Sequence, residues 1–206
     1  MAEQHTPTQE PRPRRVQVLS RERLVDEFFQ LDRLLLRYER FDGTLSPPLS
    51  RLLFERGDAA GVLLYDPESW TVLLTRQFRH AAHDRGDDPW LWEIVAGTQD
   101  PADDGASTAR REAVEEAGYH PETLTHVASV YLSPGATTER IHLFVAPVSP
   151  SERVALGGGL ALEHEDIQVA WFPLDEALAM VKRGEIIDAK TVICLQHLEL
   201  MRHGRG

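Results

Sequence analysis

The alternation of hydrophobic and polar residues predicts mostly β-strands in the first half of the chain. The polar, proline-rich residues 1–14 have no periodicity, and we expect a disordered tail there. Within 15–57, three alternating segments are separated by turn signals, which predicts a small N-terminal β domain. The following strands are predicted at 59–66, 71–78 and 90–97, the first two as a hairpin and the third after a long polar loop at 80–89.

The pattern changes to a helical period at 107–119. Ser107 is the expected N-cap, and Gly118 stands where a left-handed residue ends a helix. Further strands are predicted at 125–132, 139–148 and 167–174, and further helices at 174–183 and 188–202. Strands and helices do not alternate as a regular βαβ repeat. We therefore predict an α+β fold, a mixed β-sheet flanked by helices, over residues 58–206.

The N-terminal segment carries apolar groups on both faces of its second predicted strand. Phe29, Leu31 and Leu35 alternate with Phe28 and Leu34. So small a sheet is marginal in water on its own, so we expect it to pack on another surface. The main domain of the same chain is one candidate for that surface, and a partner subunit is the other.

Composition narrows the class of protein. The chain has 22 basic and 33 acidic residues, a formal net charge of −11, which argues against non-specific nucleic-acid binding. Cys194 is the only cysteine, and the longest apolar run, 59–65, is too short to span a bilayer. No apolar signal core is visible near the N-terminus. These features lead us to expect a cytoplasmic protein that binds neither membranes nor nucleic acids.

Three glutamates gather on one face of the predicted helix at 107–119. Glu112, Glu115 and Glu116 are three and four residues apart, a spacing at which like charges repel by a few tenths of a kcal/mol. Carboxylate oxygens are hard ligands that suit Mg²⁺ or Mn²⁺, and a divalent cation would turn this repulsion into attraction. Arg111 is placed to hold Glu115. A solvated acidic helix face is the alternative interpretation.

The residues around these glutamates resemble the signature of the Nudix hydrolases, G-x5-E-x7-R-E-U-x-E-E-x-G-U, where U is apolar. Here Gly97 is followed after five residues by Asp103, and after seven more by Arg111-Glu112-Ala113-Val114-Glu115-Glu116-Ala117-Gly118-Tyr119. Asp103 replaces the family glutamate, and Ala113 is small for its position. Most of the remaining chain, including the turn Ser133-Pro134-Gly135, is similar to the ADP-ribose pyrophosphatase branch of this family, although GDP-mannose pyrophosphatases have a similar turn.

The resemblance implies a Nudix fold, an α/β/α sandwich, and a hydrolase that cleaves the pyrophosphate of ADP-ribose to AMP and ribose 5-phosphate. GDP-mannose or another nucleotide sugar is the alternative substrate, and a non-hydrolytic ADP-ribose-binding module is a third interpretation. The family's metal-ligand positions fall on Glu112, Glu116 and the backbone carbonyl of Ala96, with Glu115 as a further ligand. Mg²⁺ is the expected cofactor, and Mn²⁺ is possible.

The family likeness also assigns the remaining site residues. The loop 157–167 offers Glu163 as the favoured general base and Glu165 as the alternative, and its three glycines are typical of a closing loop, although an acidic surface loop has the same pattern. Arg111 completes the catalytic assignment. The substrate-binding positions are Arg79 for a phosphate, Glu93 for the sugar hydroxyls, Phe28 and Arg51 for an adenine sandwiched across a homodimer, and Pro134 and Glu139. Arg79 could equally be a simple ion-pair partner, and Phe28 could be a core residue.

Overall fold

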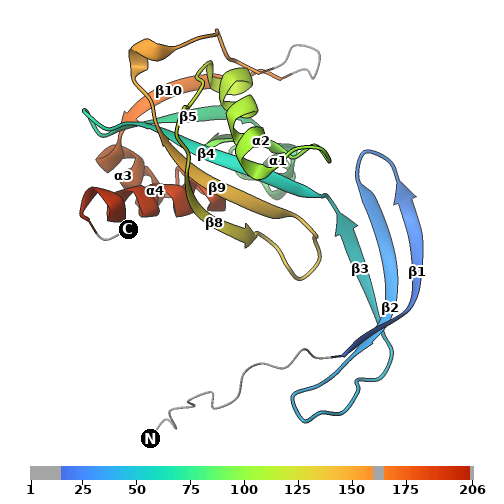
Figure 1. The fold of residues 1–206 in the computed structure, drawn as a ribbon. Coiled ribbons are helices and arrows are strands. Elements are labelled where there is room, and N and C mark those ends of the chain that lie inside the picture. Colours follow the sequence, from blue (N-terminus) through green and yellow to red (C-terminus); the bar gives the residue numbers. More distant parts are fainter. Residues whose placement is uncertain (1–14, 160–164, 205–206) are drawn as a thin grey trace, which may run out of the picture. The chain divides into compact units, whose positions relative to one another are not determined.

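The computed structural model describes residues 15–159 and 165–204 (Figure 1). The tail predicted at 1–14 lies outside this range. The chain divides into two compact units: the N-terminal unit extends to Arg56 and includes Gly135–Thr137, and the larger unit contains Gly57–Pro134 and the chain from Thr138 onwards. No helix among the described residues is long and apolar enough to cross a membrane.

The N-terminal unit is a three-stranded antiparallel sheet in the order β1-β2-β3. Its strands are β1 (Val16–Asp26), β2 (Gln30–Tyr38) and β3 (Leu49–Glu55). The backbone N–H of Phe54 donates to the carbonyl of Ala136 at 2.8 Å, which joins Gly135–Thr137 to this unit. Strand β2 contains a buried charged residue. Asp32 is fully buried, and its carboxylate forms ion pairs with Arg21 and Arg23 of β1.

The larger unit is built on a mixed sheet in the order β10-β5-β4-β9-β8, with β6 beside β5 and β7 beside β4. Its strands are β4 (Asp58–Asp66), β5 (Thr71–Phe78), β6 (Trp90–Glu93), β7 (Val95–Thr98), β8 (Thr125–Tyr131), β9 (Arg140–Pro147) and β10 (Gln168–Pro173). Only the pair β4–β9 is parallel among the strand pairs of the described chain. The predicted hairpin is the antiparallel pair β4–β5.

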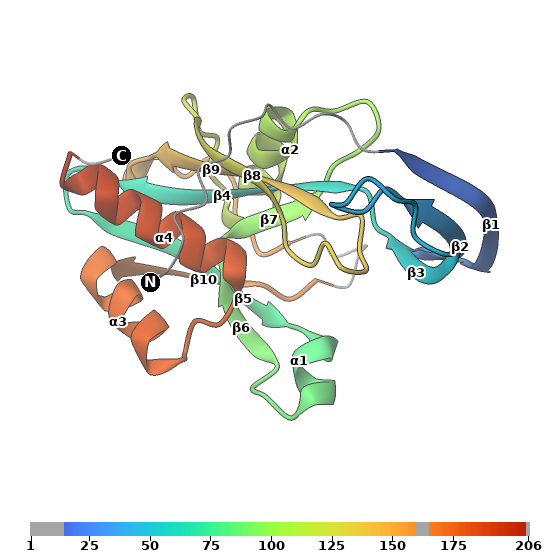
Figure 2. The ribbon, with the colours of Figure 1, turned by 90° about the horizontal axis from the view of Figure 1, so that it is seen from below.

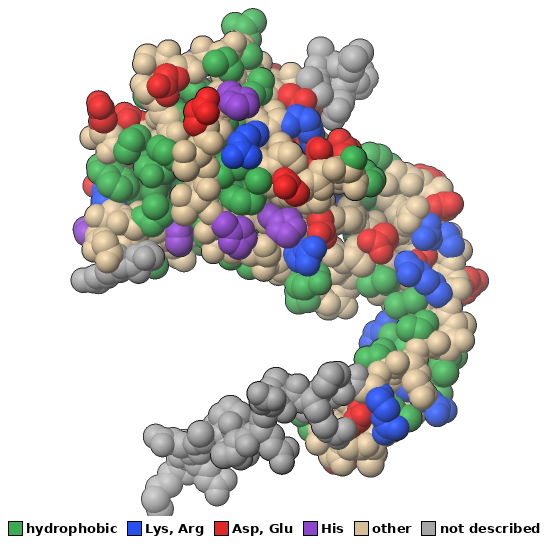
Figure 3. Space-filling model, in the orientation of Figure 1, with side chains coloured by type: hydrophobic (Ala, Val, Ile, Leu, Met, Phe, Trp, Pro, Cys, Tyr) green, Lys and Arg blue, Asp and Glu red, His purple; other side chains and the backbone are tan. Residues whose placement is uncertain are grey.

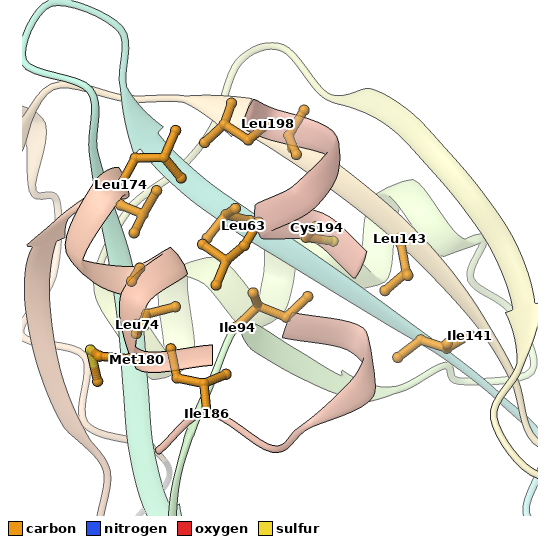
Figure 4. Close-up of a cluster of buried hydrophobic side chains, with 14 of the residues drawn as sticks. Leu63, Leu74, Ile94, Ile141, Leu143, Leu174, Met180, Ile186, Cys194 and Leu198 are labelled. Carbon is orange, nitrogen blue, oxygen red and sulfur yellow. The ribbon is translucent and has the colours of Figure 1, made fainter. Parts of the chain in front are cut away.

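Helices cover both faces of this sheet (Figure 2). On one face lies α2 (Gly105–Glu112), continued by the π-helical turn η1 (Ala113–Ala117). On the other face lie α3 (Leu174–Arg183) and α4 (Ala189–Arg202). A short 3₁₀ turn, η2, spans Pro150–Glu152 after β9. Each face has its own buried cluster of apolar side chains. Figure 4 shows the cluster under α3 and α4, in which Leu63 lies near Cys194. The predicted α+β sandwich is confirmed.

Three local predictions are wrong. The loop expected at 80–89 contains a short helix, α1 (His80–Arg85), which Gly86 ends in a left-handed conformation with φ of 86°. The strand expected at 90–97 is broken at Ile94, because its two halves pair with different strands, β5 and β4. The N-cap of α2 is Asp104, and Ser107 is instead the third helical residue of a capping box with it.

Candidate active site

The three glutamates of the carboxylate cluster, Glu112, Glu115 and Glu116, lie where α2 becomes the π-turn η1. Asp104 fixes the start of the helix by accepting a hydrogen bond of 2.7 Å from the Ser107 N–H. Gly118 fixes its end, with φ of 82° as the sequence predicts. Between them, Glu112 is the last residue of α2, and Glu115 and Glu116 belong to the widened turn. Single π-turns inside helices are common at functional sites.

Strand β7 packs directly against this cluster. The Ala96 N–H donates to Oε2 of Glu116 at 3.3 Å. A Cβ at Gly97 would lie 1.9 Å from Oε1 of Glu112, so a side chain at this position would occupy the space of that carboxylate. The missing side chain of Gly97 therefore allows Glu112 to lie against the strand. The structure thus brings together Ala96, Glu112 and Glu116, which were predicted to lie at the metal site.

The electrostatics of the cluster are those of a site with too much negative charge. Burial raises the pKa of Glu112 to about 7; Arg111 opposes this shift, and the charges of Glu115 and Glu165 add to it. Burial raises the pKa of Glu116 to about 8, and the charges of Glu112 and Glu165 add to the shift. Raised pKa values mean that burial and mutual repulsion of these carboxylates outweigh the positive charge near them. This oxygen-rich donor set fits a hard divalent cation.

Arg111 organises the glutamates that are more exposed. Its Nη1 lies 2.9 Å from Oε1 of Glu112 and 2.9 Å from Oε2 of Glu115, which is the ion pair that the i, i+4 spacing predicts. Its Nη2 donates to the carbonyl of Thr98 at 3.1 Å. Within the described part of the chain, no three acidic, imidazole or thiol side chains already converge as a metal-ligand set.

The glycine-rich loop is anchored to the same helix end. The N–H groups of Gly158 and Gly159 donate to the carbonyls of Glu116 and Glu115 at 2.7 and 3.1 Å. A Cβ at Gly157 would lie 2.7 Å from backbone atoms of the π-turn. All three glycines have positive φ values. In the structure they allow a left-handed backbone and close packing, and the closing role expected for this loop stays a prediction.

The structure describes only one of the two candidate bases. Glu163 lies outside the described residues. Glu165 is half-buried, and its charge raises the pKa values of both Glu112 and Glu116, so it lies within electrostatic range of the carboxylate cluster. Asp103, which replaces the family glutamate, lies in the loop before α2, where its backbone carbonyl accepts a hydrogen bond of 2.7 Å from Gln99.

A second buried cluster surrounds Glu93 at the end of β6. Arg79 donates to it through Nε at 2.6 Å and Nη2 at 2.9 Å. Lys190 of α4 also contacts it, and Lys190 contacts Asp188 at 2.9 Å. Although burial alone would raise the pKa of Glu93, the hydrogen bonds from Arg79 and the charge of Lys190 lower it to about 2. Lys190 and Asp188 were not predicted as site residues. The only signal in the sequence was a lysine within an apolar helical segment.

The other predicted substrate contacts are spread over both units. Phe28 is in the turn between β1 and β2, 87% exposed, and therefore is not a core residue of the N-terminal unit. Arg51 is exposed on β3 of the same unit and donates to the Ser50 carbonyl at 2.9 Å. Pro134 is exposed at the turn after β8, and Glu139 is half-buried before β9, both in the larger unit. On the face of the larger unit seen in Figure 3, acidic and basic side chains are interspersed.

Comparison with known proteins gives consistent matches. Residues 55–193 match the family model of the NUDIX domain. The chain is 40% identical to the ADP-ribose pyrophosphatase of Escherichia coli strain K12 over 185 residues, covering 90% of this chain and 88% of that protein. It is 42% identical to the GDP-mannose pyrophosphatase of Citrobacter koseri over 176 residues, covering 85% and 90%.

A solved structure supports the fold. A protein described as an ADP compounds hydrolase superposes with a TM-score of 0.68 at 18% identity, covering 93% of this chain and 97% of its own. Nudix hydrolases generally use divalent metal cations, in agreement with the donor set at Glu112 and Glu116. The family model covers most of the larger unit and contains the whole carboxylate cluster. The chain therefore belongs to the Nudix family.

Proposed function

We propose that this protein hydrolyses the pyrophosphate of ADP-ribose to AMP and ribose 5-phosphate with the help of Mg²⁺. The proposal rests on the pair of buried carboxylates, Glu112 and Glu116, whose pKa values are raised by burial and by the charges of neighbouring carboxylates. The similarity to an ADP-ribose pyrophosphatase over most of both chains supports the substrate. A pyrophosphate is itself anionic, so its binding beside these carboxylates requires cations between the two sets of charges.

The chain's own residues supply a coherent set of roles. Glu112, Glu116 and the Ala96 carbonyl would hold the metal, with Glu115 as a further ligand. A bound divalent cation polarises a phosphoryl oxygen and lowers the pKa of water. Arg111 orients Glu112 and Glu115 through its two contacts of 2.9 Å.

Two further roles are acceptance of a proton from the attacking water and binding of a substrate phosphate. Glu163 accepts the proton of the attacking water, and Glu165, whose charge acts on Glu112 and Glu116, is the alternative acceptor. Arg79, whose side chain is 39% exposed, presents its guanidinium to a substrate phosphate.

GDP-mannose is the second candidate substrate, because a GDP-mannose pyrophosphatase is as similar to this chain as the ADP-ribose relative. A release assay separates the two. We expect AMP and ribose 5-phosphate from ADP-ribose with a higher kcat/KM than for GDP-mannose or other nucleotide sugars. A higher value for GDP-mannose would reverse the assignment. Binding of ADP-ribose with no product release in Mg²⁺ or Mn²⁺ would identify a binding module instead.

We also propose that the active unit is a homodimer formed through the N-terminal unit. This unit exposes several apolar side chains, namely Val16, Val18, Val25 and Leu52 in its sheet and Phe28 in the turn between β1 and β2. Sheets of this size are marginal in water unless they pack on another surface. A partner subunit would cover these groups and bring Phe28 and Arg51 to the neighbour's adenine. Sedimentation analysis of the full chain tests this, because a fully active monomer would contradict it.

A cytoplasmic location is proposed as well. Cys194 is a buried free thiol, so the core contains no disulfide that would need an oxidising compartment. Cell fractionation checks this, and recovery in a secreted fraction would contradict it.

A further inference from the structure

Both carboxylate oxygens of Glu93 are already occupied by side chains of this chain. Oε1 accepts from Nε of Arg79, and Oε2 accepts from Nη2 of Arg79 and from Nζ of Lys190. The residue is 2% exposed. A carboxylate has about four acceptor positions, and three of them are used here, so a substrate hydroxyl would have to reach the remaining position on a side chain that is almost fully buried. This environment does not fit a residue that contacts the sugar.

The contacts of Glu93 extend to the start of α4. Lys190 also donates to Asp188 at 2.9 Å, and Asp188 caps the helix by accepting from the Thr191 N–H at 2.9 Å. The Thr191 hydroxyl in turn accepts from the Ile94 N–H at 2.8 Å, next to Glu93. The charges of Arg79, Glu93, Lys190 and Asp188 alternate in sign and sum to zero. Helix α4 is thereby fixed to the break between β6 and β7.

Arg79 is the only member of this chain of charges that has a substantial exposed surface. Its side chain is 39% exposed, whereas those of Glu93, Lys190 and Asp188 are 2%, 10% and 14% exposed. A guanidinium has five N–H donors in a rigid fork, and Glu93 accepts from two of its nitrogens. Although burial lowers the pKa of Arg79, its hydrogen bonds to Glu93 and the charges of Glu93 and Glu116 raise it. Arg79 therefore lies within electrostatic range of the carboxylate cluster.

We propose that Glu93 is a positioning residue for Arg79, and that Lys190 and Asp188 hold Glu93 in place for this role. Arg79 then offers its remaining donors to a phosphate group with its fork already oriented. The inference rests on the proposed function, because the anion that Arg79 receives is the substrate pyrophosphate. It replaces the expected contact between Glu93 and the sugar hydroxyls.

A ligand without a sugar separates the two roles of Glu93. We would measure the Kd of inorganic pyrophosphate with Mg²⁺ by calorimetry, and the KM of ADP-ribose, in the wild type and in Glu93→Gln. Positioning predicts that both values rise by a similar factor, roughly tenfold, the scale of one charge-assisted hydrogen bond. A direct sugar contact predicts a higher KM for ADP-ribose with an unchanged Kd for pyrophosphate, and this result would overturn the proposal.

The chain contains a matched control for this substitution. Arg183 donates to Glu185 through Nε at 2.6 Å and Nη2 at 3.0 Å, the same two-nitrogen pairing on an exposed surface. Glu185→Gln should leave both values unchanged. If the wild type does not bind pyrophosphate, the proposed function is contradicted. An error in the proposed function and an error in the role of Glu93 therefore give different results.

Substitution of Lys190 tests the second half of the proposal. Lys190→Met removes the charge with little change in volume, and we expect it to raise the Kd of pyrophosphate about tenfold, with recovery in Lys190→Arg. A lower melting temperature with an unchanged Kd would assign Lys190 a purely structural role and overturn this half. If Lys190→Met does not fold, Asp188→Asn provides the same comparison, with the same two outcomes, while keeping Lys190 and its contact with Glu93.

Discussion

Glu93 and Glu116 are equally buried, at 2% exposure each, yet their carboxyl groups have opposite electrostatics. The pKa of Glu93 is lowered to about 2, whereas that of Glu116 is raised to about 8. Burial pushes both values upwards. The difference comes from the neighbours, because Arg79 and Lys190 surround Glu93, whereas Glu112 and Glu165 act on Glu116.

The chain supplies its own positive charge around Glu93 but not around Glu116. A buried carboxylate is tolerated when it is paired and hydrogen-bonded, as Glu93 is. At Glu116 the main compensation is one backbone N–H, from Ala96 at 3.3 Å, together with the more distant charge of Arg79. The first arrangement is complete without a ligand. The second is an electrostatic deficit that a divalent cation would remove.

The largest effect is expected on turnover, when the loop glutamates Glu163 and Glu165 are replaced. Glu163→Gln should leave substrate binding intact and slow turnover by roughly a hundredfold or more, the scale for loss of a positioned general base. Steady-state kinetics with ADP-ribose measures this, and Glu165→Gln is the matched comparison. If Glu165→Gln loses turnover while Glu163→Gln does not, the base is Glu165, whose charge acts on Glu112 and Glu116.

A smaller effect is expected at Gly97, where a side chain would occupy the space of the Glu112 carboxylate. Gly97→Ala should weaken Mg²⁺ affinity by about tenfold or more, the scale for disturbing the support of a metal ligand. Calorimetric titration of Mg²⁺ measures this change. In a Glu112→Gln background the same substitution should add little, because the displaced ligand is already impaired. Additive losses would contradict the steric explanation.

The smallest effect is the pH dependence of stability without divalent cations. Glu112 and Glu116 have raised pKa values, so the folded state binds more protons than the unfolded state between pH 4.5 and about 8. Stability should therefore fall as pH rises through this window, by several degrees in Tm at about 2–4 °C per kcal/mol. Glu93 has the opposite effect, because its pKa is lowered. Its contribution to folding stability is present above pH 4.5 and is lost as the pH falls to about 2.

Thermal melts in a chelator from pH 5 to 8 measure this slope. Glu116→Gln should flatten it, because the amide has no proton to lose. A Tm that is constant or rises between pH 5 and 8 in the wild type would contradict the asymmetry between the two carboxylate sites.

Local periodicity predicted most of the larger unit. Helix α3 begins and ends at the expected residues, 174 and 183, and strand β5 spans the expected 71–78. The carboxylates of α2 and η1 were also predicted, because their spacing is local to one helix. The cap of α2 was misplaced by three residues, because Asp104 and Ser107 are both good capping residues and only the backbone geometry distinguishes them.

The surroundings of Glu93 could not be predicted. Lys190 is 97 residues away in the sequence, and no periodic pattern indicates that the start of α4 meets the end of β6. The break at Ile94 has the same origin, because it depends on which strands lie beside β6 and β7. The role of Gly97 was also hidden, since a glycine at a strand end gives no sign of the carboxylate that fills its missing side chain.

The proposed cation site of Glu112 and Glu116 has an unbalanced negative charge until a metal binds. The most direct test is the change in Tm on adding Mg²⁺ to the wild type, Glu116→Gln and the surface control Glu185→Gln. Saturating Mg²⁺ should raise the wild-type Tm by several degrees, since binding at about 100 times Kd stabilises by roughly 2.7 kcal/mol. We predict that Glu116→Gln loses most of this rise and that the control keeps it. An equal rise in Glu116→Gln would contradict the account.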